Sequence, residues 1–137
     1  MAALTQTAGS VAPSSNQQIS LATAGGSITA GMPVYLDSSD SNKAKAADAN
    51  ASQAASAAVG IALNSASTGQ SVQYQTSGRI NLGATLATGT TYYVGATAGE
   101  INPSGDLASG WYVHRLGYAV STSILQMDLM AYGVAVP

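Results

Sequence analysis

The sequence predicts an all-β fold of about eight to ten short strands, in the form of a β-barrel or β-sandwich. Glycines that mark turns recur at intervals of about ten residues, as at Gly78, Gly89, Gly99 and Gly110. Short segments rich in Val, Ile, Tyr and Thr lie between these glycines, and one order of turn and strand motifs occurs twice. Turn signals at this spacing are typical of all-β domains.

Composition limits the classes of function that this chain can serve. The 137 residues suit one domain, and only 7% of them are charged, with a formal net charge of −2. So few cations exclude a basic patch for nucleic acid and a polybasic membrane anchor. The chain has no cysteine and one histidine, so it has no disulfide or cysteine-ligated metal.

Small side chains dominate the sequence. Ala, Gly, Ser and Thr together make up just over half of the residues, and each buries little apolar area. We therefore expect a thin hydrophobic core that gains stability when the chain buries further surface against partners. A surface with few charges also defends poorly against association, which favours a permanent assembly over a free monomer.

The chain divides at residue 17 in this interpretation. Residues 1–17 are rich in Ser, Ala, Gln and Thr and lack periodicity, so we expect either a floppy terminus or an extended N-terminal arm that orders on a partner. Residues 18–137 are expected to form a single β domain. The first twenty residues lack the positive charge and apolar run of a signal peptide, and no stretch of 18 apolar residues predicts a transmembrane helix.

Local patterns predict individual elements. Residues 71–76 alternate, with Val72 and Tyr74 on one face and Gln73 and Gln75 on the other. Residues 124–130 alternate as well, with Leu125, Met127 and Leu129 against Gln126, Asp128 and Met130. The alanine-rich residues 46–58 predict one or two helical turns, with Asn50 and Gln53 spaced as in a capping box.

The body reads as two copies of one unit. Residues 31–36 align with residues 89–94, and residues 59–63 align with residues 116–120, at nearly the same separation. Hairpin tips are expected at residues 38–42 and 97–99. The sequence therefore predicts a small pseudo-symmetric β-barrel or sandwich of two similar units, each covering the apolar face of the other.

Residues that carry chemistry are scarce. Any Ser-His-Asp triad must include His114, which lies in a predicted strand without a nucleophile elbow. Asp37, Asp40, Asn42 and Asp48 lack the order and the glycine of a calcium loop, so a polar hairpin tip is favoured. Glu100, Asp106 and Asp128 are scattered rather than paired. We expect no catalytic, metal or cofactor site, and no enzyme.

The aromatic residues suggest contacts between subunits. Tyr92 and Tyr93 are adjacent, as are Trp111 and Tyr112, so one member of each pair must face outward in a strand. Tyr and Trp suit half-buried interfaces because each joins an apolar ring to a polar atom. We take all four as candidate subunit-contact residues.

Several glycine and strand motifs carry a resemblance to a known family. They are Gly-x-x-Val-Tyr-Leu-Asp at 31–37, Lys-Ala-x-Ala-Ala-Asp at 43–48, Val-Gly-Ile-Ala at 59–62, Gly-Gln-x-Val at 69–72, Gly-x-x-Tyr-Tyr-Val at 89–94, Ala-Gly-Glu-Ile at 98–101 and Leu-Gly-Tyr-Ala at 116–119. Residues 25–133 resemble a module of tailed bacteriophages that occurs among head decoration (capsid cement) proteins and in head or tail fibre domains.

The resemblance implies a structural virion protein that is made in the host cytoplasm. It would bind the major capsid protein on the outer surface of the head as a homotrimer and bridge neighbouring capsomers, with no nucleic-acid or membrane partner. The arm would contact the capsid, with Leu4, Thr5, Val11 and Pro13 as candidate contact residues. The alternative is a receptor-binding module associated with tail or head fibres; an ice-binding surface and an enzyme rank lower.

Overall fold

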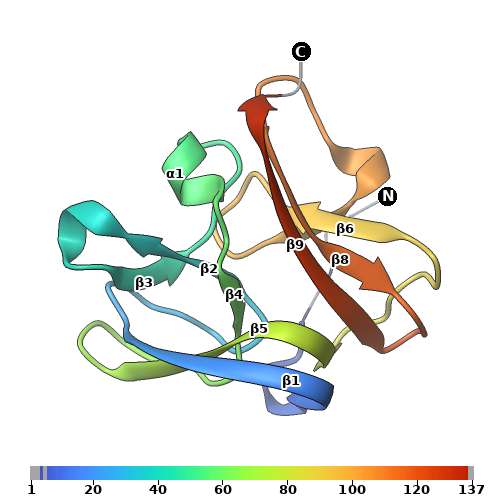
Figure 1. Ribbon diagram of the computed structural model, residues 1–137, viewed down its shortest axis with the longest axis horizontal. Coiled ribbons are helices and arrows are strands. Elements are labelled where there is room, and N and C mark those ends of the chain that lie inside the picture. The colour runs from blue at the N-terminus through green and yellow to red at the C-terminus, as the bar shows by residue number, and fades with distance from the viewer. Residues whose placement is uncertain (1–3, 5, 136–137) are drawn as a thin grey trace.

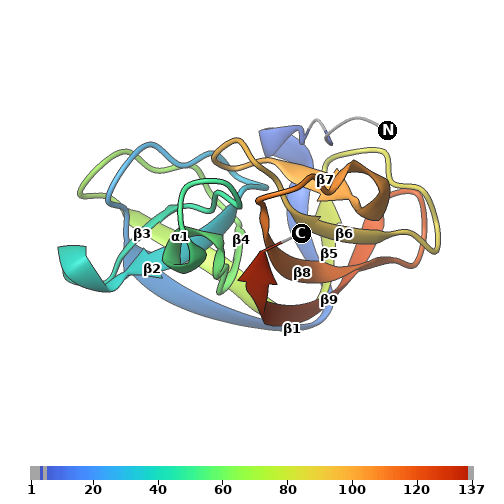
Figure 2. The same cartoon turned by 90° about the horizontal axis from the view of Figure 1, so that it is seen from above.

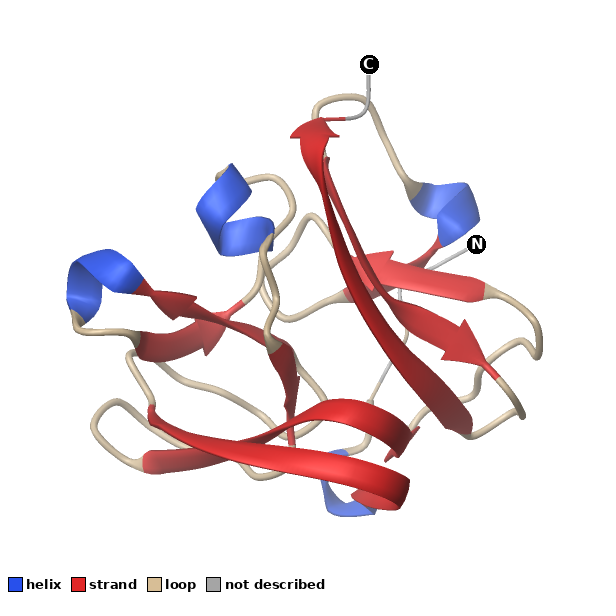
Figure 3. Ribbon diagram, in the orientation of Figure 1, coloured by secondary structure: helices blue, strands red, loops and turns tan. Residues whose placement is uncertain are grey.

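The structure is a computed structural model that describes residue 4 and residues 6–135. Figure 3 shows an all-β molecule with short helical turns, which confirms the predicted fold class. The strands are β1 (Val11–Thr23), β2 (Pro33–Asp37), β3 (Lys43–Ala46), β4 (Gly60–Ala62), β5 (Ser71–Leu82), β6 (Thr91–Val94), β7 (Ile101–Pro103), β8 (Tyr112–Ala119) and β9 (Ile124–Ala135). The helical elements are η1 (Ala8–Ser10), η2 (Ser38–Asp40), α1 (Gln53–Ser56) and η3 (Ser104–Asp106).

All nine strands belong to one curled antiparallel sheet that branches at β5. Its main path runs β3-β2-β4-β5-β9-β8-β6-β7, and β1 pairs with β5 outside that path. One edge of β5 carries β1, whereas the other carries β4 at Tyr74 and Gln75 and then β9 from Gly78 to Asn81. In Figure 1, β2 and β3 lie on the left, β8 and β9 on the right, and β5 runs beneath both groups; Figure 2 shows the same division from above.

Each half of the sheet has its own buried cluster. The smaller cluster includes Ile28, Val34, Val72 and Tyr74. A parallel bridge between Ala24 and Ala44 brings the end of β1 back to β3, so this half curls nearly closed. The larger cluster is formed mainly by residues from β5 to β9 and also takes in alanines of the 47–58 segment.

The strand order repeats between the halves. β3-β2-β4-β5 in the first half corresponds to β7-β6-β8-β9 in the second, and β5 pairs antiparallel with β9. A Cβ atom on Gly60 would overlap the backbone oxygen of Gln75, and one on Gly117 would overlap that of Gln126, so both aligned positions exclude a side chain. The equivalence of the two units in three dimensions stays a prediction.

Most local predictions agree with the structure. The expected hairpin tips lie between β2 and β3 and between β6 and β7. Leu125 and Met127 are buried whereas Asp128 and Met130 are exposed, as the alternation requires. The single turn of α1 is capped by the Ser52 hydroxyl, which accepts a hydrogen bond from the Ala55 N–H at 3.0 Å, rather than by the Asn50 and Gln53 pair.

The N-terminal arm is not confirmed. Residues 11–17 belong to β1, and Val11, Ala12, Pro13 and Ser15 pair with β5, so the strand crosses the boundary placed at residue 17. Leu4 and Val11 pack against the larger core cluster, and the Leu4 N–H donates to the Ile101 oxygen at 2.9 Å. Pro13 is exposed within β1, and Thr5 lies outside the described residues. No residue of β1 is fully buried. The strand therefore forms by pairing with β5, and its sequence shows no alternation of apolar and polar residues.

Gln75 also departs from expectation. The alternation of residues 71–76 placed it on the outer face with Gln73, but its side chain is 0% exposed. Its Nε2 donates to the backbone oxygens of Ser77 at 2.8 Å and Arg79 at 2.9 Å. These carbonyls lie where β5 changes its neighbour from β4 to β9, so the buried amide supplies donors at the branch of the sheet.

Gly78 provides a test of this branch region. Its φ of +87° is in the left-handed range, and a Cβ atom there would overlap the backbone oxygen of Asn16 in the irregular part of β1. We expect Gly78→Ala to lower the free energy of unfolding by about 3 kcal/mol or more, measured by urea denaturation, because strain and overlap add.

Gly69→Ala is the matched control. Gly69 has nearly the same φ of +88° but open space where the Cβ atom would lie, so its substitution should cost about 1 kcal/mol from backbone strain alone. Equal losses in the two variants would show that the contact between Gly78 and β1 does not constrain the sheet.

Candidate functional site

His114 is buried inside the second half of the sheet. It lies on β8, opposite Ala131 of β9, and is 4% exposed. Neither ring nitrogen makes a hydrogen bond of normal geometry to any residue that the structure describes. Burial lowers the pKa of His114, and the nearby Ala58 backbone opposes this shift. Burial therefore favours the neutral ring, and among the described residues no carboxylate or hydroxyl is hydrogen-bonded to it as in a catalytic triad.

The acidic residues at the first hairpin tip are paired with lysines. The Lys45 Nζ lies 2.8 Å from Asp37 Oδ2 and 3.2 Å from Asp40 Oδ2, and Lys43 lies 3.8 Å from Asp40. Hydrogen bonds from Lys45 and Ser39 lower the pKa of Asp37 to about 2. The same ion pairs raise the pKa of Lys45. Asp37 and Asp40 thus form ion pairs across the tip of a polar hairpin, in agreement with the interpretation that the sequence favoured.

Two further acidic side chains have separate partners. Asp128 pairs with Arg115 on β8 at 2.8 Å, whereas Asp106 accepts a hydrogen bond from Asn102 at 3.1 Å. That hydrogen bond lowers the pKa of Asp106. Across residue 4 and residues 6–135, no group of three or more His, Cys, Asp and Glu side chains is placed to hold a metal ion.

One depression lies beside the smaller buried cluster, since Ile28 and Ala66 belong to both. Its volume is about 220 Å³, and it is lined by Ser27, Ile28, Ser65, Ala66, Ser67 and Gln70. Backbone hydrogen bonds between Ile28 and Ala66 form its floor. The lining offers hydroxyl and amide groups but no ionisable side chain.

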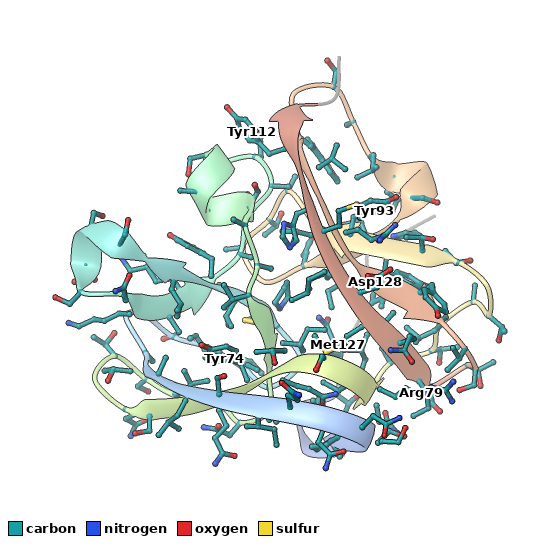
Figure 4. All side chains as sticks on the ribbon, viewed as in Figure 1. Tyr74, Arg79, Tyr93, Tyr112, Met127 and Asp128 are labelled. Atoms are coloured by element: carbon teal, nitrogen blue, oxygen red, sulfur yellow. The ribbon has the colours of Figure 1, made fainter. Side chains whose placement is uncertain are left out.

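The four aromatic candidates separate into different environments. Tyr92 is 2% exposed, and its hydroxyl accepts a hydrogen bond from the Ala87 N–H at 2.9 Å. It therefore belongs to the core, and its prediction as a subunit contact is corrected. Tyr93, Trp111 and Tyr112 are partly exposed. Figure 4 places Tyr112 near the upper end of β9 and Tyr93 well below it, so these residues do not form one patch.

A cluster that the sequence analysis did not identify lies on the outer face of β5, β8 and β9. We call it the outer-face cluster, and its members are Arg79, Arg115, Tyr118, Gln126, Asp128 and Met130. Cross-strand pairs share a face, and the register pairs Arg79 and Tyr118 with Gln126, and Arg115 with Met130. Gln126, Asp128 and Met130 alternate along β9, so all six side chains lie on this face.

The outer-face cluster has the chemistry of an interface. Tyr118 is 43% exposed and Met130 is 46% exposed. The Arg79 Nε donates to Gln126 Oε1 at 3.1 Å, and Arg115 forms an ion pair with Asp128 at 2.8 Å. Figure 4 labels Arg79 and Asp128, one member of each pair. Arg, Tyr and Met are enriched in protein interfaces. The alternation of residues 124–130 indicated this face, but the sequence alone could not supply the cross-strand partners.

Comparison of the chain with protein-family models, with curated proteins and with solved structures found no match. Among the described residues, no helix has the length and apolar character needed to cross a bilayer.

The buried imidazole predicts a specific dependence of stability on pH. The unfolded chain binds a proton at His114 as the pH falls through about 6.5, whereas burial delays protonation in the folded chain to lower pH. The contribution of the neutral His114 to the free energy of unfolding is therefore fully present above about pH 6.5. Below that pH the free energy of unfolding falls, by at most about 1.4 kcal/mol per pH unit for one proton. Denaturation of the wild type and His114→Leu between pH 7.5 and 4.5 measures the effect.

The variant should lose this slope, whatever its stability at pH 7.5. Asp37 affects stability only at lower pH. Its pKa is lowered in the folded state, so the stability that it contributes is lost only as the pH falls below the unfolded value of 3.8. Identical slopes in wild type and variant would contradict a neutral, poorly solvated His114.

Proposed function

We propose that this chain is a structural virion protein that binds the outer surface of a bacteriophage head and bridges neighbouring capsomers. The observation that carries the proposal is the outer-face cluster, which presents arginine, tyrosine and methionine from three adjacent paired strands of the sheet. The resemblance of residues 25–133 to head decoration modules supplies the identity of the partner, the major capsid protein.

The proposed action is mechanical rather than chemical. A subunit that binds two capsomers at once binds the assembled shell better than separated capsomers. It therefore stabilises the assembled shell, as any ligand stabilises the state that it binds. Tyr118 and Met130 would bury apolar area against the shell, and Arg79 and Arg115 would donate to backbone or carboxylate oxygens there. Arg79 and Arg115 are already held by Gln126 and Asp128, which lowers the side-chain entropy that they lose on binding.

A homotrimer would increase this effect. Three subunits that engage three equivalent sites bind with an avidity far above that of one subunit, without any new contact. Tyr93, Trp111 and Tyr112 remain the proposed contacts between subunits, since each is partly exposed. We place the proposed capsid contact at the outer-face cluster, where Tyr118 is 43% and Met130 is 46% exposed, rather than at the less exposed Leu4 and Val11.

One observation favours the alternative of a receptor-binding module. The serine-lined depression offers hydroxyl groups and the Gln70 amide at an open surface, and such groups hydrogen-bond to sugars. Binding to specific glycans in an array, abolished by substitution of Ser67, would support this alternative over the decoration role.

Binding to undecorated capsids of the phage that carries the gene tests the proposal. The wild type should co-sediment with the capsids and raise the temperature at which they dissociate. Arg79→Ala combined with Tyr118→Ala should weaken binding by about tenfold or more, because both side chains are central to the proposed contact. Ser67→Ala, in the depression of the first half, is the control and should bind as the wild type does.

Two results would contradict the proposal. Wild-type protein that does not bind the capsids would remove the decoration role, and full affinity in the double variant would remove the outer-face cluster from the contact.

A further inference from the structure

Arg79 carries a positive charge that no acidic side chain of the described structure neutralises. The chain has four cationic side chains, which are Lys43, Lys45, Arg79 and Arg115. Both lysines form ion pairs with aspartates of the first hairpin tip, and Arg115 forms one with Asp128. Arg79 is exposed and forms no ion pair with any residue that the structure describes. Its charge is therefore available to a negative group of a partner.

Gln126 holds the Arg79 guanidinium in one orientation. The Arg79 Nε donates to Gln126 Oε1 at 3.1 Å. The Gln126 Nε2 donates in turn to the backbone oxygens of Gly78 at 3.4 Å and Met127 at 3.3 Å, so the amide oxygen is the atom that faces Arg79. On the inner side of β5, the buried Gln75 amide donates to the Arg79 backbone oxygen at 2.9 Å. Arg79 is thus held both at its backbone and at its Nε.

The terminal edge of this guanidinium remains available to a ligand. The bond to Gln126 uses the N–H on Nε, whereas the N–H groups on the two Nη atoms form no hydrogen bond with a residue that the structure describes. Two parallel N–H groups of this kind match the two oxygens of a carboxylate. Because Gln126 already orients the side chain, Arg79 loses less rotamer freedom when such a group binds.

Exposed apolar groups accompany this cation on the outer face. The register places Gln126 between Arg79 on β5 and Tyr118 on β8, and Met130 lies farther along β9. Tyr118 is 43% exposed and Met130 is 46% exposed. Figure 4 shows Arg79 near the lower end of β9 and Asp128 higher along that strand. The outer-face cluster therefore combines one unmatched cation with apolar surface that a protein partner can bury.

The charge of the chain favours a carboxylate over a polyanion as the ligand. Nucleic acids and anionic lipid surfaces are bound by several cations that neutralise many phosphates together. Here the formal net charge is −2, and Arg79 is the one cation without an ion pair among the described residues. A single unmatched cation beside apolar side chains suits one acidic side chain on a protein surface.

We propose that Arg79 binds an aspartate or glutamate side chain of the partner protein, and that Tyr118 packs against apolar groups next to it. The inference rests on the proposed function, in which the partner is the major capsid protein. The carboxylate accepts a pair of hydrogen bonds from the Arg79 Nη atoms while Gln126 keeps its bond to Nε. A capsid surface without an acidic side chain at this point would leave the cation unpaired in the contact, so Arg79 determines which surface is bound.

Two variants of Arg79 separate its charge from its geometry in binding to undecorated capsids. Arg79→Gln removes the charge, so it should weaken binding by about tenfold or more and reduce the dependence of the affinity on salt. Arg79→Lys keeps the charge but lacks the paired donors, so binding should weaken by about fivefold with the salt dependence retained. Lys43→Gln removes one positive charge outside the outer-face cluster and should bind as the wild type does. Circular dichroism checks that every variant is folded.

Arg79→Lys also identifies the group that is bound. A water-soluble carbodiimide converts a carboxylate into an O-acylisourea, and a nearby lysine amine then forms an amide bond while the urea leaves. Treatment of the variant on capsids should therefore give a cross-link to an aspartate or glutamate of the capsid protein that the wild type does not give, as mapped by mass spectrometry. Gln73→Lys, at an exposed position of β5 outside the cluster, is the control and should give no such cross-link.

The outcomes distinguish this contact from the decoration role. Wild-type protein that does not bind capsids would contradict both. Binding by the wild type together with equal binding by Arg79→Gln would overturn the carboxylate contact alone. Weaker binding by Arg79→Gln without a new cross-link from Arg79→Lys would overturn it as well, because Arg79 would then contact a carbonyl oxygen or a phosphate instead of a carboxylate.

Discussion

The fold depends on one strand that serves two halves of the sheet. β5 keeps β1 along one edge while its other edge passes from β4 to β9. At this change of partner, the fully buried Gln75 amide donates to the carbonyls of Ser77 and Arg79. A carbonyl that is shielded from water and lacks a donor costs about 1–3 kcal/mol, so the Gln75 amide stabilises the branch by donating to these two partly buried carbonyls.

This branch determines where contact surfaces can form. Because both halves share β5, the outer-face cluster lies on paired strands of one sheet and not on a loop. The interior is small, with many alanines among its buried residues, so much of the apolar and hydrogen-bonding capacity of the chain lies at its surface. Such a distribution suits a protein that acts by attachment to neighbours.

The sequence predicts what depends on local alternation and turns, such as the burial of Leu125 and Met127 and the hairpin at residues 38–42. It misses what depends on pairing across the sheet. β1 has no fully buried side chain and therefore no periodic signal. Gln75 reads as an outward residue because its burial follows from the branch, and Tyr92 cannot be distinguished from Tyr93 without the register. The outer-face cluster joins three strands that only the register brings together.

Native-state hydrogen exchange of the wild type and Gln75→Leu tests most directly whether β5 unites the two halves. If it does, the slowest amides of β2 and β4 and those of β8 and β9 exchange in the wild type through one opening with the same free energy. The variant removes the donor to two partly buried carbonyls, so it should lower the opening free energies of both halves by the same amount, about 1–3 kcal/mol. A loss confined to one half would show that the halves are stabilised separately and would contradict this description of the molecule.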